Sequence, residues 1–300
     1  MHRRTFLFRT SGLILSIAVA GRVSAVATVA DRLAMSTVTF RSRFAQTKPK
    51  GVDRIERELT LLSVPQYYRD RFGIRQLELW GHHFESLEKP YLEELRSRVQ
   101  GAGAQVVNVQ ADADYDLASE NEEERQRSLA VAQQWVDAAA LLGSRAVRIN
   151  PGKTSGSIEK SIASMRQING YCRSKRLPLL IENHFGLEMD PDVHLRIREE
   201  AGPGNVYTLP DFGNYPAETM WDSLSKILPY AYLVSAKTVK FNERLEHVSY
   251  DFDRCVQMAE RAGFKGIYSV EQWSREDLSV DAERVVDWML RRVRANIAAE

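Results

Sequence analysis

Residues 179–186, with the sequence LLIENHFG, form an apolar run typical of a buried strand that stops abruptly at Glu182, Asn183 and His184. A carboxylate at the end of a buried strand is shielded from water and still reachable by a ligand, so this is a typical catalytic position. The run therefore predicts both a strand and a site residue, and similar runs elsewhere in the chain indicate the fold.

Three further strand-like runs downstream also end in polar groups. VYTLPDFGN places Asp211 after a short apolar run, and GIYSVEQW places Glu271 after another. Between them, AYLVSAKT ends in Ser235 and Lys237. Carboxyl ends of parallel barrel strands converge on one face, so these residues are expected to share one site.

Short runs rich in Val, Ile and Leu alternate with helix-length segments of 3.6-residue periodicity. Strands are predicted at 75–80, 104–110, 145–150, 178–183, 206–210, 231–237 and 266–271, with a first strand at 36–40. Helices are predicted at 85–100, 118–142, 157–176, 191–201, 216–227, 251–262 and 277–297. The pattern predicts a single-domain (β/α)8 TIM barrel. The competing architecture, an open doubly wound sheet, calls for a glycine-rich phosphate turn after an early strand, and the sequence has none.

The chain is divided into three parts. Residues 1–27 combine the paired arginines Arg3 and Arg4, a short apolar run at 13–20 and small-residue cleavage sites near Ala25 and Ala27, as in a twin-arginine export signal. This predicts a periplasmic or secreted protein; the alternative is a basic N-terminus before a core helix. Residues 28–54 are a segment of uncertain structure, and 55–300 are assigned to the barrel.

Charge and composition limit the kinds of partner that this chain is expected to bind. Removing residues 1–27 takes away four arginines and no acids, which moves the formal charge from +1 to −3. Without a basic stripe, a nucleic-acid partner is not expected. The apolar run is too short to span a bilayer, and no lasting membrane anchor is expected. Only Cys172 and Cys255 are present, and a disulfide between them and a homo-oligomer are both left open.

Polar residues close the earlier strands as well. His82 and His83 follow the strand at 75–80, Asn108 ends the next, and Asn150 ends the one after that. The two histidines also have a plainer interpretation, as loop residues that bind no ligand. The acids of the later strands have one as well, as helix caps or members of ion pairs. Three acids in equivalent positions favour a shared site.

The segments IENH, PDFGN, SAKT and VEQ, in this order over roughly residues 55–297, resemble the sugar phosphate isomerase/epimerase family of xylose-isomerase-like barrels. The resemblance implies a divalent metal, usually Mn²⁺ or a similar ion, held by Glu182, Asp211 and Glu271. The family's usual histidine in the SAKT segment is replaced by Ser235. A histidine common three residues after the metal aspartate is replaced by Asn214.

The chemistry expected of such a site is proton transfer next to a carbonyl. Two carboxylates on opposite sides of one carbon exchange acid and base roles, and a cation stabilises the enediolate. Glu182 and Glu271 are the predicted acid/base pair, and Lys237 the cationic partner. Oxygen ligands favour Mn²⁺ or Mg²⁺, with Zn²⁺ or Co²⁺ as alternatives. The residues predicted to bind a small carbohydrate substrate are His83, Asn108, Asn150, His184, Asn214 and Trp273.

Two other functions remain open on the same barrel. A lyase, dehydratase or hydrolase acting on a keto-sugar or keto-glycoside would use the same enediolate to expel a β-substituent. A non-catalytic periplasmic sugar-binding protein is the other alternative, motivated by Ser235 and Asn214.

Overall fold

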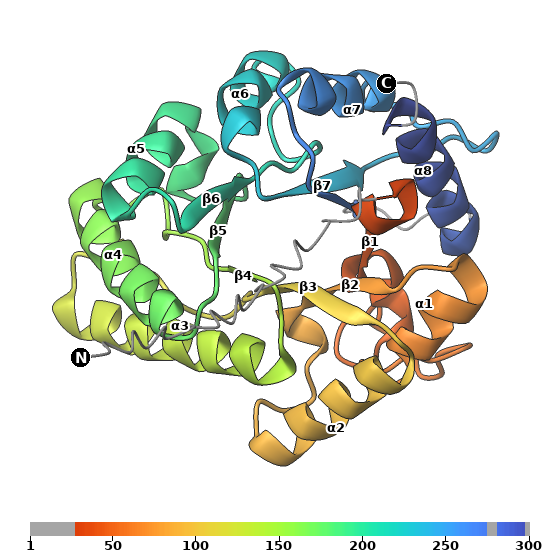
Figure 1. Ribbon diagram of the computed structural model, residues 1–300, viewed down its shortest axis with the longest axis horizontal. Coiled ribbons are helices and arrows are strands. Elements are labelled where there is room, and N and C mark those ends of the chain that lie inside the picture. The colour runs from red at the N-terminus through yellow and green to blue at the C-terminus, as the bar shows by residue number, and fades with distance from the viewer. Residues whose placement is uncertain (1–27, 275–280, 298–300) are drawn as a thin grey trace, which may run out of the picture.

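The computed structural model describes residues 28–274 and 281–297, and within them eight parallel strands form a ring enclosed by helices (Figure 1). The predicted export signal, residues 1–27, lies outside the described residues. The strands are β1 (Leu33–Ser36), β2 (Gln76–Trp80), β3 (Gln105–Gln110), β4 (Val147–Arg148), β5 (Leu179–Glu182), β6 (Val206–Leu209), β7 (Leu233–Thr238) and β8 (Ile267–Gln272). The helices are α1 (Val64–Phe72), α2 (Lys89–Gly101), α3 (Glu122–Leu142), α4 (Ile158–Ser174), α5 (Pro191–Ala201), α6 (Met220–Ile227), α7 (Phe252–Arg261) and α8 (Ala282–Ile297).

The strands are paired in the order β6-β5-β4-β3-β2-β1-β8-β7, and every pair is parallel. The ring is completed between β6 and β7 by isolated bridges, Thr208 with Ala231 and Asp211 with Ser235, in place of a continuous ladder. The prediction of a (β/α)8 barrel is confirmed. The site residue Asp211 is therefore part of the seam that closes the barrel.

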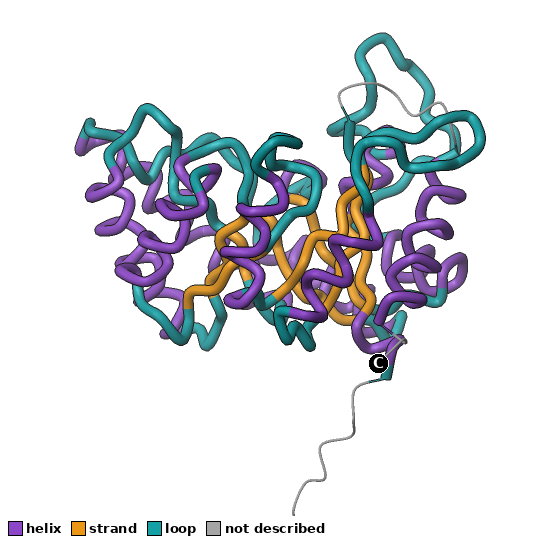
Figure 2. The backbone as a smooth tube through the Cα atoms, turned by 90° about the horizontal axis from the view of Figure 1, so that it is seen from above, coloured by secondary structure: helices purple, strands orange, loops and turns teal. Residues whose placement is uncertain are grey.

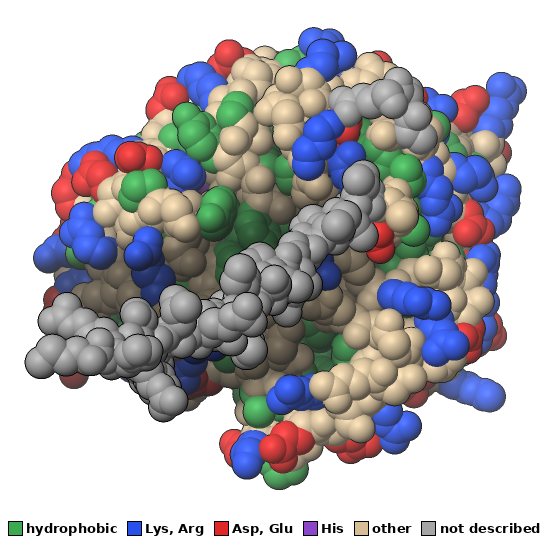
Figure 3. Space-filling view, viewed as in Figure 1, with side chains coloured by type: hydrophobic (Ala, Val, Ile, Leu, Met, Phe, Trp, Pro, Cys, Tyr) green, Lys and Arg blue, Asp and Glu red, His purple; other side chains and the backbone are tan. Residues whose placement is uncertain are grey.

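Alternate residues of each strand point into the barrel or out toward the helices. Part of the barrel interior is filled by a small apolar cluster consisting of Ala34, Val107, Ala146, Leu180, Leu209 and Leu233. A much larger apolar layer lies between the strands and the surrounding helices. Charged side chains lie over the outer helices, and the centre of the ring is hollowed on the face seen in Figure 3.

Local signals in the sequence fix where several helices begin and end. The Asn121 side chain accepts a hydrogen bond from the backbone N–H of Glu124 at the start of α3, and three glutamates occupy the first turn. Gly143 ends that helix with φ 69°, a conformation that glycine adopts without strain. Asp190 caps α5 in the same way as Asn121 caps α3. Figure 2 shows the helices and strands roughly aligned, with the loops gathered at the two ends.

The beginning of the barrel differs from the sequence-based prediction. The first strand is Leu33–Ser36, and residues 37–40 of the expected strand belong to a 3₁₀ helix, Thr37–Arg43. The Thr37 hydroxyl there accepts a hydrogen bond from the backbone N–H of Trp80, so a β-branched run serves as a connection beside β2. The barrel consequently begins before residue 55. The short helix α1 was not predicted.

Two other expectations are addressed by the described residues. Cys172 in α4 and Cys255 in α7 are both buried as free thiols. No helix in the described ranges has the length and apolar character needed to cross a membrane.

We predict that buried histidines make the barrel sensitive to acid. Burial lowers the pKa of His194 in α5 to about 4, from 6.5 in the unfolded chain. A group whose pKa is depressed by folding contributes stability above its unfolded pKa, and this contribution is lost as the pH falls from about 6.5 toward 4. Between about pH 7 and about pH 5, His194 should account for a loss of about 2 kcal/mol in the free energy of unfolding.

The measurement is urea unfolding of wild-type protein and of H194Q at both pH values. H194Q should lose correspondingly less stability on acidification, whereas H82Q, a change at an exposed histidine, should behave like the wild type. Equal pH dependence in H194Q and the wild type would contradict the prediction.

Candidate active site

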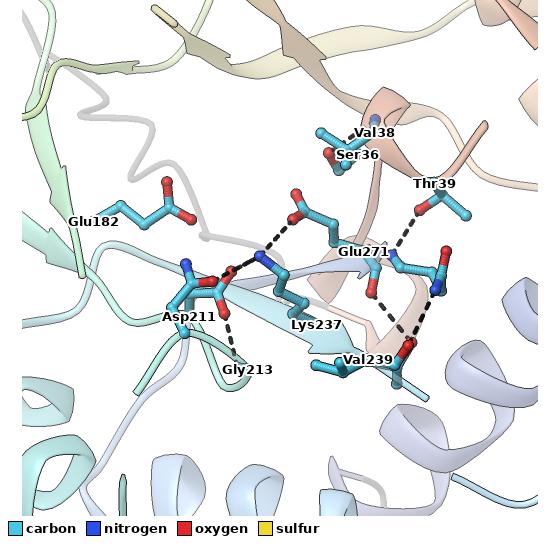
Figure 4. A network of polar contacts seen from close by, with 12 residues as sticks. Ser36, Val38, Thr39, Glu182, Asp211, Gly213, Lys237, Val239 and Glu271 are labelled. Carbon is cyan, nitrogen blue, oxygen red and sulfur yellow. Dashed lines mark hydrogen bonds and ion pairs between the residues drawn. The ribbon is translucent and has the colours of Figure 1, made fainter. Parts of the chain in front are cut away.

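Three acids lie together at the C-terminal end of the barrel strands. Glu182 ends β5, Asp211 follows β6, and Glu271 lies near the end of β8; none is more than 4% exposed. Lys237 of β7 reaches between two of them, with its Nζ 3.4 Å from Asp211 Oδ2 and 3.4 Å from Glu271 Oε1 (Figure 4). The two carboxylate oxygens are therefore separated by at most twice that distance. The structure brings together the acids and the lysine that the sequence placed on successive strand ends.

A second buried cation holds Glu182. Arg148 of β4 places its Nε 3.1 Å from Glu182 Oε2. The other side of its guanidinium forms a two-pronged pair with Asp112, at 2.5 Å and 3.0 Å. The Trp80 indole N–H donates to the same Asp112 carboxylate. The pairs make a continuous chain from Trp80 through Asp112 and Arg148 to Glu182.

The pKa values at these positions reflect both burial and charge. Burial raises the pKa of Glu182 well above its usual range; the Arg148 charge opposes this, and the charges of Asp211 and Glu271 add to it. Burial alone would raise the pKa of Asp112, but the adjacent Arg148 guanidinium holds it well below its usual range. The site thus favours a protonated Glu182 next to an ionised Asp112.

Asparagine side chains position the acids through the backbone. Asn183 accepts a hydrogen bond from the Asp211 backbone N–H at 2.7 Å and donates to the Asp211 carbonyl at 3.0 Å. Asn150 accepts from the backbone N–H of Glu182 at 3.0 Å. Asn214 accepts from Lys237 Nζ at 2.8 Å, so it orients the lysine.

A cavity of about 430 Å³ opens above these residues. Its charged part is lined by Asp112, Asp114, Arg148, Glu182, Lys237 and Glu271. Its aromatic part is supplied by Trp80, His82, His184, Phe185 and Trp273. This size and lining suit a small polar molecule with a ring. A larger hollow of about 1,050 Å³ lies at the opposite end, where the strands begin, and shares none of these residues.

The cavity continues past His184 and Phe185 into a smaller hollow of about 200 Å³, which Asn150 and Glu188 help to line. Phe185, at the junction, leaves 60% of its side chain exposed. Of the predicted substrate-binding residues, His184 and Trp273 line the main cavity and Asn150 the smaller one.

Three predicted substrate-binding residues lie elsewhere. His83 is fully buried: its ring stacks on Phe44 at 3.6 Å between centroids, and its two nitrogens contact the hydroxyls of Thr37 and Thr47. The exposed neighbour His82 lines the cavity instead. Asn108 is buried and donates to Glu78, and Asn214 is turned toward Lys237.

Sequence analysis gave no site role to Arg148 and Asp112. One signal for Arg148 was available, because it shares the inward face of its strand with Ala146 and Asn150, and a cation in such a position requires a buried partner. Asp112 lies in a loop, and nothing local to its sequence indicates that it meets an arginine of the next strand.

A family model described as the xylose isomerase-like TIM barrel matches residues 70–294. The chain belongs to this family. No curated protein sequence matched the chain significantly.

Several solved structures share the fold. A xylose isomerase-like TIM barrel protein from Mycobacterium smegmatis, in complex with magnesium, is 15% identical with a TM-score of 0.62, covering 89% of this chain and 97% of that one. The 3-keto-D-glucoside 4-epimerase of E. coli is 15% identical with a TM-score of 0.63, covering 88% and 99%. A probable 3-DHS dehydratase from Bacillus anthracis is 14% identical with a TM-score of 0.63, covering 87% and 97%.

The three converging carboxylates do not fit a divalent metal ion as they are arranged here. The Lys237 ammonium lies between Asp211 and Glu271, and Arg148 is paired with Glu182. Among residues 28–274 and 281–297, no group of three or more His, Cys, Asp or Glu side chains is placed to hold a metal. The metal ligands expected from the sequence gain no support from this arrangement and stay a prediction.

Arg148 should be among the most sensitive positions in the barrel. R148M leaves Asp112 and Glu182 without their buried cation, and removing one partner of a buried ion pair costs about 3–5 kcal/mol. Denaturant unfolding of R148M and the wild type measures the loss. R196M, which removes the exposed ion pairs of Arg196 with Glu159 and Glu200, is the control and should cost less than about 1 kcal/mol.

The triple variant D112N/R148M/E182Q removes the Arg148 cation together with the acid groups of both its partners. It should be more stable than R148M, because no unpaired charge remains buried. An R148M protein as stable as R196M would show that the buried pairs contribute little.

Proposed function

We propose that this protein is an enzyme that isomerises or epimerises a carbohydrate by moving a proton at a carbon next to a carbonyl. The observation that carries the proposal is the placement of Glu182 and Glu271 on the same cavity, from strands on different sides of the barrel, with Lys237 between them (Figure 4). Two carboxyl groups at one cavity can act on opposite faces of a bound carbon.

Glu271 is the proposed base. It removes the proton from the carbon next to the carbonyl, and the electron pair of the broken C–H bond forms the enediolate double bond as negative charge moves to the carbonyl oxygen. Glu182, whose protonated form is favoured by burial, is the proposed acid and returns a proton to the enediolate. Return to the opposite face of the same carbon gives an epimer. Return to the former carbonyl carbon gives an isomer, once the hydroxyl proton of the first carbon has moved to the former carbonyl oxygen.

Lys237 supplies the positive charge that the enediolate oxygen needs. Burial alone would lower its pKa, but the charges of Asp211 and Glu271 raise it above the ordinary value, so the ammonium stays protonated. A fixed cation in a water-poor site stabilises developing charge without reorganising. Asn214, bonded to Nζ, orients that charge.

A carbohydrate is the proposed substrate because the cavity combines charged groups with aromatic faces. Trp80, Phe185 and Trp273 offer rings against which the apolar face of a sugar packs. The E. coli epimerase that shares this fold acts on a keto-glucoside, as its name states. That likeness supports the substrate class and leaves open which sugar this chain uses and whether the sugar is phosphorylated.

A keto-sugar lyase, dehydratase or hydrolase is the second candidate. A protonated Glu182 beside the cavity suits protonation of a β-substituent as it leaves the enediolate, and one protein of this fold is named as a probable dehydratase. Product analysis separates the two candidates, since elimination yields an unsaturated product and isomerisation does not. A non-catalytic periplasmic sugar-binding protein would show neither product.

We also propose export by the twin-arginine route, with residues 1–27 as the signal and the barrel acting in the periplasm or outside the cell. Fractionation of cells that carry the intact chain, compared with R3K/R4K, tests this. The wild type should be processed and exported, and the variant retained.

Loss of either glutamate should abolish proton exchange. E271Q and E182Q keep the shape of the side chain and remove the acid or base, so incorporation of solvent deuterium into the substrate should fall about 100- to 10,000-fold. The assay screens free, oxidised and glycosidic sugars by NMR with the wild type first. E200Q, on the exposed face of α5, is the control and should exchange at the wild-type rate. Folded E271Q that exchanges normally would contradict the assigned roles.

A further inference from the structure

Two side-chain cations already lie among the acids of this cluster. Four buried or largely buried carboxylates, those of Asp112, Glu182, Asp211 and Glu271, face two buried cations, Arg148 and Lys237. Arg148 is committed to Asp112 and Glu182 through three nitrogen–oxygen contacts. Lys237 contacts the other two acids, Asp211 and Glu271.

Three polar groups surround the Lys237 ammonium. Its Nζ contacts Asp211 Oδ2, Glu271 Oε1 and Asn214 Oδ1, at 3.4, 3.4 and 2.8 Å. An ammonium has three N–H donors, and these contacts match them in number. The lysine is 4% exposed and is the next-to-last residue of β7, so its position is set by the barrel wall.

Ser235 provides an independent observation on the same strand. It shares the inward face of β7 with Lys237, since the two are two residues apart. Its hydroxyl is fully buried and has no hydrogen-bond partner within the described part of the chain. A serine at this position offers a metal ion no nitrogen ligand. A divalent ion would therefore have only oxygen ligands, and it would compete with the ammonium for them.

We propose that Lys237 takes the place of a divalent cation, so that this barrel carries out its chemistry with a cation built into the protein. An ion bound to Asp211 and Glu271 would lie within a few ångströms of the ammonium, and like charges at that distance in a buried site repel strongly. Metal binding therefore requires the lysine to leave or lose its proton. The catalytic use of Lys237 rests on the proposed function, but its exclusion of metal does not.

Direct titration with Mn²⁺ tests the proposal without a substrate. The chain purified with a chelator, and then freed of it, is titrated by calorimetry and by the electron spin resonance signal of free Mn²⁺. Wild-type protein should show no saturable binding at millimolar Mn²⁺. S235H/K237A, which restores a nitrogen donor and removes the ammonium, should bind Mn²⁺ at least about tenfold more tightly. S235H alone, which keeps the lysine, should stay close to the wild type.

The outcomes separate cleanly. Saturable Mn²⁺ binding by the wild type that is lost in D211N would overturn the proposal. So would failure of a folded S235H/K237A, judged by its near-ultraviolet circular dichroism, to bind Mn²⁺ better than S235H. If S235H/K237A does not fold, the wild-type and D211N titrations still decide whether the wild type binds Mn²⁺ through Asp211. A wild-type protein that binds no Mn²⁺ and exchanges no sugar proton supports the role of Lys237 in excluding metal and contradicts the proposed function alone.

Discussion

The structure depends on the pairing of two buried cations with four carboxylates at the C-terminal end of the barrel. Removing a charge from water costs several kcal/mol unless partners with good geometry replace the solvent. Arg148 and Lys237 supply those partners from β4 and β7, strands that are separated by more than eighty residues along the chain. The same contacts that make this burial tolerable also fix the relative positions of β4, β5, β8 and the β6–β7 seam.

This arrangement couples the closure of the barrel to the geometry of the site. Asp211 lies at the seam where β6 and β7 are joined by isolated bridges, and its backbone is held by the Asn183 side chain from the β5 end. Its carboxylate then meets Lys237 from the strand across that seam. A site built on strand ends in this way is held more rigidly than one built on loops, and rigidity is what a preorganised electrostatic environment requires.

The sequence predicted the parts of this structure that depend on local pattern. Apolar runs that stop at a polar residue mark the strand ends, and the barrel geometry brings those ends to one face, so Glu182, Asp211, Lys237 and Glu271 were predicted to lie together. Contacts between residues far apart in the sequence were harder to predict. Nothing in the local sequence shows that Asp112 meets Arg148, or that His83 stacks on Phe44 instead of facing the cavity. The first strand was misplaced because the β-branched residues at 37–39 belong to a 3₁₀ helix, from which the Thr37 hydroxyl accepts a hydrogen bond from the backbone N–H of Trp80 in β2.

A covalently attached cation has chemical consequences that differ from those of a bound ion. An ammonium carries one charge and donates hydrogen bonds, whereas a divalent metal accepts several oxygen ligands at once. Lys237 would therefore stabilise charge on one substrate oxygen and leave the second to a neutral donor or to a protonated Glu182. Burial favours that protonated form, so the pKa of Glu182 and the presence of a lysine are parts of the same arrangement. With a single positive charge between Asp211 and Glu271, a neutral Glu182 reduces the excess of negative charge in the cluster.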